Sequence, residues 1–204
     1  MSSKPCRSSA AAATPSTGVA GLNLMGREVV RPGGAFGLDP VVVTIDVREL
    51  GIPGYQAGDW LRAERHVDVG FADACRVSAR IIHGDDDETG RILVDALDSL
   101  VDGTASMDRP RRVDLPEPLS LELENAMIPR DAFFARVEQV PVAEAVGGVA
   151  AELVSPYPPG VPVLAPREVI SQEAVDYLTT GVRAGMLVPD AADSSLETLR
   201  VVTE

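Results

Sequence analysis

The sequence contains very little lysine, and this shortage excludes one kind of chemistry from any folded site. Of its 18 basic residues, 17 are arginines and one is a lysine, Lys4. We expect residues 1–20 to form a disordered leader, because their apolar stretch, Ala10–Ala13, is too short for the hydrophobic region of a signal peptide. A mechanism that needs a lysine amine as a base or Schiff-base partner is therefore excluded within this chain.

Cysteines and histidines are scarce as well. Cys6 and Cys75 are too few for a disulfide framework or a CxxC zinc site, which favours a reducing cytoplasm. His66 and His83 are the only histidines, and there is no GxSxG sequence, so a Ser-His-Asp catalytic triad is possible but poorly supported. The HExxH sequence of zinc-dependent hydrolases is absent. No apolar run approaches the ~20 residues of a membrane helix. The net charge of −13 removes nucleic acid and anionic membranes as default partners.

What is present suits one large domain or two small ones, since the chain has 204 residues of which 45% are apolar. Residues 21–103 alternate between patterns typical of strands and helices. We expect a β-α-β-β-α order from the segments 41–47, 55–65, 67–71, 76–82 and 92–101. These patterns predict a small, sandwich-like α+β domain in which helices are layered on a mostly antiparallel sheet.

A second unit follows a polar, proline-containing linker over residues 104–124. Residues 125–204 predict a small α/β domain. Pro129 is expected to begin a short helix, and Ser171 to cap a longer one. The remaining expected elements are a short helix between Pro141 and Gly148, a strand over 149–154 and a strand over 199–202.

The acidic run from Asp85 to Glu88, two residues after His83, permits a metal-site interpretation. Helix capping accounts for it more simply. Asp85 is a good N-cap, Glu88 lies three residues later as in a capping box, and negative charge in a first turn complements the helix dipole. We therefore favour the capping interpretation over a metal site.

The segment from Ser155 to Pro162 contains four prolines, so it predicts a rigid, extended loop instead of regular secondary structure. Tyr157 gives this loop an aromatic face and one hydroxyl group. Two interpretations stay open from the residues alone: the loop forms the wall of a pocket, or it is a stiff connection between two strands.

Three segments of the second unit, taken in order, resemble the carboxyl-terminal domain of the ornithine/lysine/arginine decarboxylase family: residues 129–134, 140–147 and 155–164. The Pro-Tyr-Pro-Pro-Gly run at 156–160 is the most specific of them. Segments of the first unit look like the small domain that precedes it in the same family: 37–40, 43–47, 54–61 and 67–73. The resemblance covers about residues 21–204.

This resemblance implies a pyridoxal-phosphate enzyme of the aspartate-aminotransferase fold type, which decarboxylates a basic amino acid to yield a polyamine or its precursor. In such enzymes the cofactor forms a Schiff base with a lysine and acts as an electron sink. The family keeps that lysine in a large domain, which this sequence lacks. We therefore expect a truncated relative with no catalytic or cofactor-binding residue of its own and no covalently bound pyridoxal phosphate. Our substrate-entrance candidates are Tyr157, Pro158, Pro159 and Gly160.

Two kinds of function follow from the resemblance. In the first, a large pyridoxal-phosphate domain or a decarboxylase subunit supplied in trans completes a decarboxylase of arginine, lysine or ornithine. In the second, the chain is a non-catalytic binding or regulatory module, or an inactive remnant, that associates with a decarboxylase. Self-association is a further expectation, because a small domain without its large domain exposes apolar surface.

Overall fold

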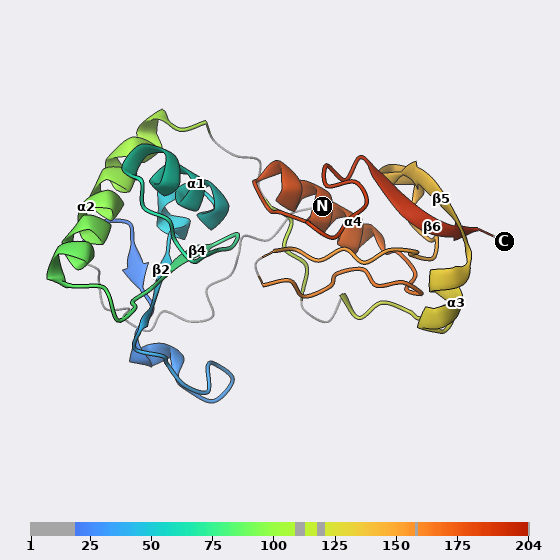
Figure 1. Ribbon diagram of the computed structural model, residues 1–204, viewed down its shortest axis with the longest axis horizontal. Coiled ribbons are helices and arrows are strands. Elements are labelled where there is room, and N and C mark those ends of the chain that lie inside the picture. The colour runs from blue at the N-terminus through green and yellow to red at the C-terminus, as the bar shows by residue number, and fades with distance from the viewer. Residues whose placement is uncertain (1–18, 109–112, 118–120, 158, 204) are drawn as a thin grey trace. The chain divides into compact units, whose positions relative to one another are not determined.

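The computed structural model describes residues 19–108, 113–117, 121–157 and 159–203. The chain folds into two units, which divide between Pro110 and Arg111. Each unit is coloured continuously along the chain in Figure 1, the first from blue to green and the second from yellow to red.

The first unit has a four-stranded antiparallel sheet covered by two helices. The strands are β1 (Asn23–Leu24), β2 (Val42–Asp46), β3 (Phe71–Ala72) and β4 (Arg76–Arg80), in the order β1-β2-β4-β3. The helices are α1 (Gly54–Arg65) and α2 (Asp87–Gly103). This arrangement confirms the expected α+β architecture with a mostly antiparallel sheet.

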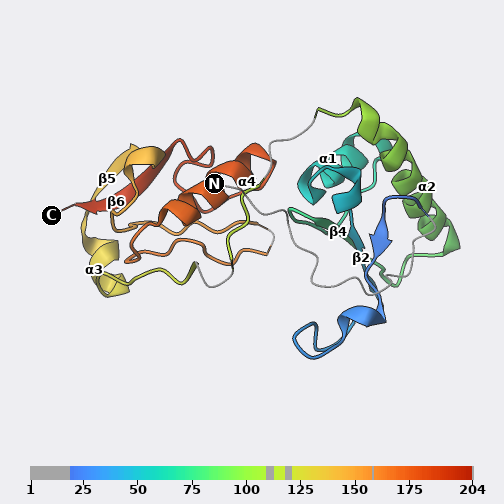
Figure 2. The same cartoon turned by 180° about the vertical axis from the view of Figure 1, so that it is seen from behind.

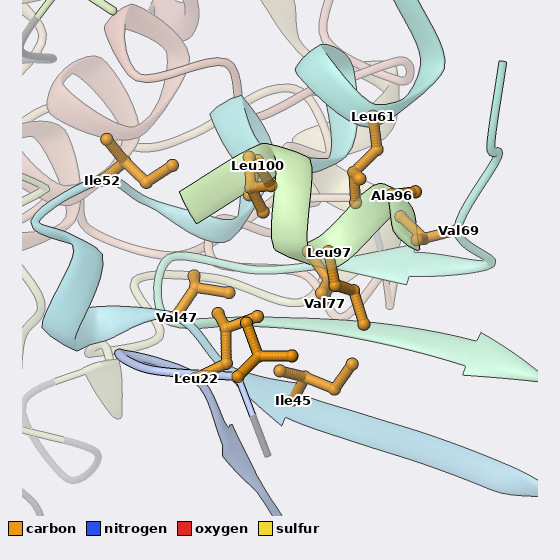
Figure 3. Close-up of a cluster of buried hydrophobic side chains, with 12 residues drawn as sticks. Leu22, Ile45, Val47, Ile52, Leu61, Val69, Val77, Ala96, Leu97 and Leu100 are labelled. Atoms are coloured by element: carbon orange, nitrogen blue, oxygen red, sulfur yellow. The ribbon is translucent and has the colours of Figure 1, made fainter. Parts of the chain in front are cut away.

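One apolar cluster holds this unit together (Figure 3). Ile45 of β2 and Val77 of β4 are register partners, and both are almost fully buried. Leu61 of α1 and Leu100 of α2 are completely buried against the same cluster. Because each helix contributes an apolar stripe and each strand one apolar face, the two helices and the sheet share a single core.

The start of α2 corrects one prediction. The N-cap is Asp86, whose carboxylate accepts hydrogen bonds from the backbone amides of Glu88 and Thr89, and Thr89 completes the capping box. Asp85 and Glu88, the expected pair, do not form it. The Asp85 carboxylate instead accepts the Ile82 amide at 2.7 Å and closes the preceding turn, so the helix begins one residue later.

The strand predicted over residues 67–71 is shorter in the structure. α1 ends with His66 in the left-handed conformation at φ 56°, and the Val67 amide returns to the Leu61 carbonyl at 3.1 Å. Pairing with β4 begins only at Phe71, opposite Ser78. The residues between the helix end and Phe71 belong to no ladder.

The second unit combines a two-stranded sheet with helices and long extended segments. Its elements are α3 (Pro129–Phe134), β5 (Arg136–Pro141), a 3₁₀ turn (Val142–Glu144), α4 (Gln172–Arg183) and β6 (Thr198–Thr203). The Ser171 hydroxyl caps α4 by accepting the Ala174 amide at 3.1 Å, which confirms the predicted cap.

Two expectations for this unit were wrong. Residues 149–154 form isolated bridges, not a strand, because Val149, Ala150 and Val154 pair with three different segments. The helix expected up to Gly148 is only the 3₁₀ turn at Val142–Glu144. The strand β5 was not predicted. Among the described residues, no helix is both long enough and apolar enough to cross a membrane.

Candidate functional site

The proline-containing loop begins and ends on a short backbone pairing. The Val154 amide donates to the Leu164 carbonyl at 2.9 Å, and the Val163 amide donates to the Val154 carbonyl at 2.9 Å. Val154 and Leu164 are both almost fully buried. The loop therefore leaves from and returns to the core of the second unit, which fixes both of its ends.

Inside the loop, further backbone bonds set the conformation around the aromatic residue. The Tyr157 amide donates to the Leu187 carbonyl at 2.8 Å, and the Gly160 amide donates to the Pro156 carbonyl at 2.8 Å. Gly160 has φ +85°, a left-handed conformation that glycine adopts without strain. Pro158, one of the candidate residues, lies outside the described residues.

Two carboxylates of the second unit, Glu152 just before the loop and Asp190 after α4, hold the flanks of the loop. Asp190 accepts the Ser155 amide at 2.9 Å. The half-exposed loop is thereby tied to the segment that follows α4. Glu152 is buried and accepts the amides of Ala192 and Arg200 at 2.7 Å and 2.6 Å, so both of its oxygens bind backbone donors. These bonds fasten the chain before the loop to the segment leading into β6.

The loop and Leu187, to which its backbone is hydrogen-bonded, present apolar side chains to solvent. Tyr157 is 54% exposed, Val161 64% and Leu187 63%. We call these three residues the entrance surface. A held backbone with exposed apolar groups and one hydroxyl is compatible with both interpretations, the pocket wall and the plain connector, because scattered exposed apolar side chains are normal on a protein surface.

The residues that fasten the loop were missed in the sequence. Leu187 and Asp190 lie 30 and 33 residues after Tyr157, and Glu152 lies just before the loop and binds amides about forty residues or more further on. One signal was available: Glu152 stands in the apolar run Val149–Val154, where a carboxylate must be hydrogen-bonded if it is buried.

The other candidates from the sequence have structural roles. Asp86 caps α2 and Asp85 closes a turn, and the described residues contain no group of three or more histidine, cysteine or acidic side chains placed to hold a metal ion. Cys75 is buried. The only lysine, Lys4, lies outside the described residues, so the described part of the chain offers no amine for covalent pyridoxal phosphate. The residues present do not fit that cofactor by themselves.

The fold is similar to part of the fold of solved lysine decarboxylases. The LdcF lysine decarboxylase of Francisella novicida superposes with a TM-score of 0.57 at 19% identity over 82% of this chain and 31% of that protein. The constitutive lysine decarboxylase of E. coli gives 0.58 at 20% identity, over 81% of this chain and 32% of that protein. At these sequence identities, the comparison shows a similarity of fold only.

Sequence comparison then gives the family. Residues 117–190 match the model of the Orn/Lys/Arg decarboxylase, C-terminal domain. An arginine decarboxylase of Bacillus anthracis is 33% identical over 88% of this chain, and one of Halalkalibacterium halodurans is 35% identical over 90%. The chain is thus a relative of the ornithine/lysine/arginine decarboxylases, as its motifs indicated. It spans only 36% and 37% of the lengths of those two relatives.

Proposed function

We propose that these residues supply the small and carboxyl-terminal domains of a pyridoxal-phosphate-dependent decarboxylase of arginine, lysine or ornithine. The observation that carries this proposal is the identity of 33–35% with arginine decarboxylases over about nine-tenths of the chain. The match spans both units, including the loop from Ser155 to Pro162, which we call the entrance loop, so the relationship extends beyond a single motif.

Decarboxylation requires a large domain in addition to these residues. Pyridoxal phosphate stabilises the negative charge left when carbon dioxide departs. It is held through a lysine, and the described residues contain none. We propose that another polypeptide in the cytoplasm provides the cofactor domain, and that this chain completes the site by forming part of its wall.

The entrance loop is the part of this chain proposed to approach the substrate. Tyr157, Pro158, Pro159 and Gly160 are the residues assigned to this role. The Tyr157 backbone is fixed by Leu187, while the ring stays half exposed and carries the hydroxyl. Such a group can exclude water from one side of a site and orient a polar substrate with little loss of side-chain entropy.

The proposal is tested by measuring carbon dioxide release from carboxyl-labelled arginine, lysine and ornithine. The full chain is assayed alone, and together with a lysine-bearing cofactor domain from the same genome. We expect release only from the mixture, because only the mixture contains both the lysine and the wall. Stable complex formation without any gain in activity would refute the catalytic proposal and support a regulatory module.

The entrance loop has its own test in the active mixture. Tyr157→Ala should lower kcat/KM at least about tenfold, equivalent to ~1.4 kcal/mol of transition-state stabilisation. Tyr157→Phe separates the contribution of the hydroxyl from that of the ring. Ile92→Ala is the matched control, since Ile92 on α2 is exposed to nearly the same extent, 52%. If Tyr157→Ala lowers thermal stability as much as activity, the loop is a structural connector.

A further inference from the structure

The sheet of the second unit has an open edge at β5. Among the residues that the structure describes, β5 pairs only with β6, and α3 leads directly into it (Figure 1 and Figure 2). The first residues of β5, Arg136 to Gln139, are all exposed. Unpaired amides and carbonyls on such an edge are ready to pair with another strand.

Hydrogen bonds elsewhere in the sheet show which residues of β5 point outward. The amides of Arg200 and Val202 turn away from β5, to Glu152 Oε1 and to the Val149 carbonyl. Their register partners on β5 are Gln139 and Val137. Two residues that lie opposite each other in an antiparallel pair of strands either exchange two backbone hydrogen bonds or both direct their backbone groups away from each other. Val137 and Gln139 therefore direct their amides and carbonyls away from β6, towards the open edge of the sheet.

The same alternation extends to the residues on either side. Ala135, two positions before Val137, has extended backbone. Pro141, two positions after Gln139, has no amide to donate. The open donors of this edge are therefore those of Ala135, Val137 and Gln139, for which the described part of the chain provides no acceptor.

The charged residues of β5 would face residues of opposite charge if two copies of this strand paired with each other. If two copies of β5 pair antiparallel with Val137 opposite Val137, then Arg136 of each copy lies opposite Glu138 of the other. In this register Ala135 lies opposite Gln139, so the outward groups of the two strands meet in hydrogen-bonded pairs. A register shifted by one residue on one strand places inward-facing amides against outward ones and loses the bonds.

Exposed apolar groups flank the same edge. Val137 is 50% exposed, and Phe134, the last residue of α3, is 74% exposed. The Arg130 guanidinium lies 5.6 Å from the centre of the Phe134 ring, which orients that ring. Pairing of two β5 strands would withdraw part of this apolar surface from water.

From the open donors, the matched charges and the apolar flank, we propose that β5 pairs antiparallel with β5 of a second copy of this chain, centred on Val137. The interface is isologous, as in a twofold dimer. It does not depend on decarboxylation, because none of its residues belongs to the entrance surface.

Sedimentation equilibrium of the full chain over a wide range of concentration tests the interface. We expect a reversible dimer. Arg136→Glu places glutamates opposite each other at two positions and should raise the dissociation constant at least about tenfold, as should Glu138→Arg. The double variant Arg136→Glu/Glu138→Arg restores both opposite-charge pairs and should return the constant to within about threefold of the parental value.

Two measurements guard against a trivial loss of fold. Arg183→Glu, an exposed charge reversal on α4, should leave the dimer unchanged. Hydrogen exchange at the amides of Val137 and Gln139 should slow as the protein concentration rises. A chain that stays monomeric, a dimer indifferent to Arg136→Glu, or protection of these amides only after a decarboxylase large domain is added would each overturn the proposal.

Discussion

The contact between α1 and the start of β4 makes Gly54→Ala the most informative single substitution in the first unit. A methyl group on Gly54 would lie 2.5 Å from the Asp73 carbonyl oxygen and closer still to that of Arg76. An ordinary C···O contact is about 3.3 Å or longer. Both obstructing atoms are backbone, so a rotamer change cannot make room.

Relief of this clash must move either α1 or the turn before β4. Moving α1 away breaks the bond from the Tyr55 amide to the Asp73 carbonyl, 3.1 Å long, and loosens the buried Leu61. Moving the turn strains the bond from the Asp73 amide to the Arg76 carbonyl. Overpacking typically costs ~1–3 kcal/mol and a lost hydrogen bond ~0.5–1.5 kcal/mol, so we expect a loss of about 2–4 kcal/mol in unfolding free energy.

The assay is urea unfolding followed by the fluorescence of Trp60, the chain's only tryptophan, which lies in α1 and therefore reports on the first unit. Gly90→Ala is the matched control. It also lies in a helix, but its methyl group would meet no atom within 4 Å, so it should stabilise by about 0.5–1 kcal/mol. Equal effects of the two substitutions would refute the packing argument.

Three further substitutions or titrations test the second unit. Glu152→Gln places an amide nitrogen against the amide of Ala192 or Arg200, and calorimetry should show a loss of ~1–3 kcal/mol. Leu178→Ala, in the buried face of α4, should cost ~2–5 kcal/mol, and a smaller change in urea unfolding would contradict the burial. Hydrogen bonds from the side chains of Ser195 and Thr198 lower the pKa of Asp193 from 3.8 to about 2; carbon NMR should find that midpoint, with the stabilisation present above pH ~4 and lost as pH falls towards 2.

Local signals in the sequence predicted the elements that local physics determines. Pro129 begins α3 and Ser171 caps α4, because both effects depend only on neighbouring residues. β2 was predicted as well, since a β-branched run suits a buried strand wherever it pairs. The exact start of α2 could not be predicted, because Asp85 and Asp86 are equally good caps and the preceding turn decides between them.

Pairing between segments that lie far apart in the chain could not be predicted from the sequence. β5 was missed because its residues are exposed and show no apolar alternation, and its partner β6 begins more than fifty residues later. The stiffness of the Tyr157 loop followed from its prolines. Its attachment to Leu187 and Asp190 did not, since a backbone bond to a distant carbonyl leaves no sequence pattern.

The central claim, that these residues complete a decarboxylase but do not carry its cofactor lysine, has one direct measurement. The chain, the large domain and their mixture are each treated with pyridoxal phosphate and borohydride, and the reduced adduct is located by peptide mass spectrometry alongside the assay of carbon dioxide. We predict an adduct on a lysine of the large domain, with release of carbon dioxide only from the mixture. Release of carbon dioxide by the chain alone, with the adduct on the chain itself, would contradict the claim.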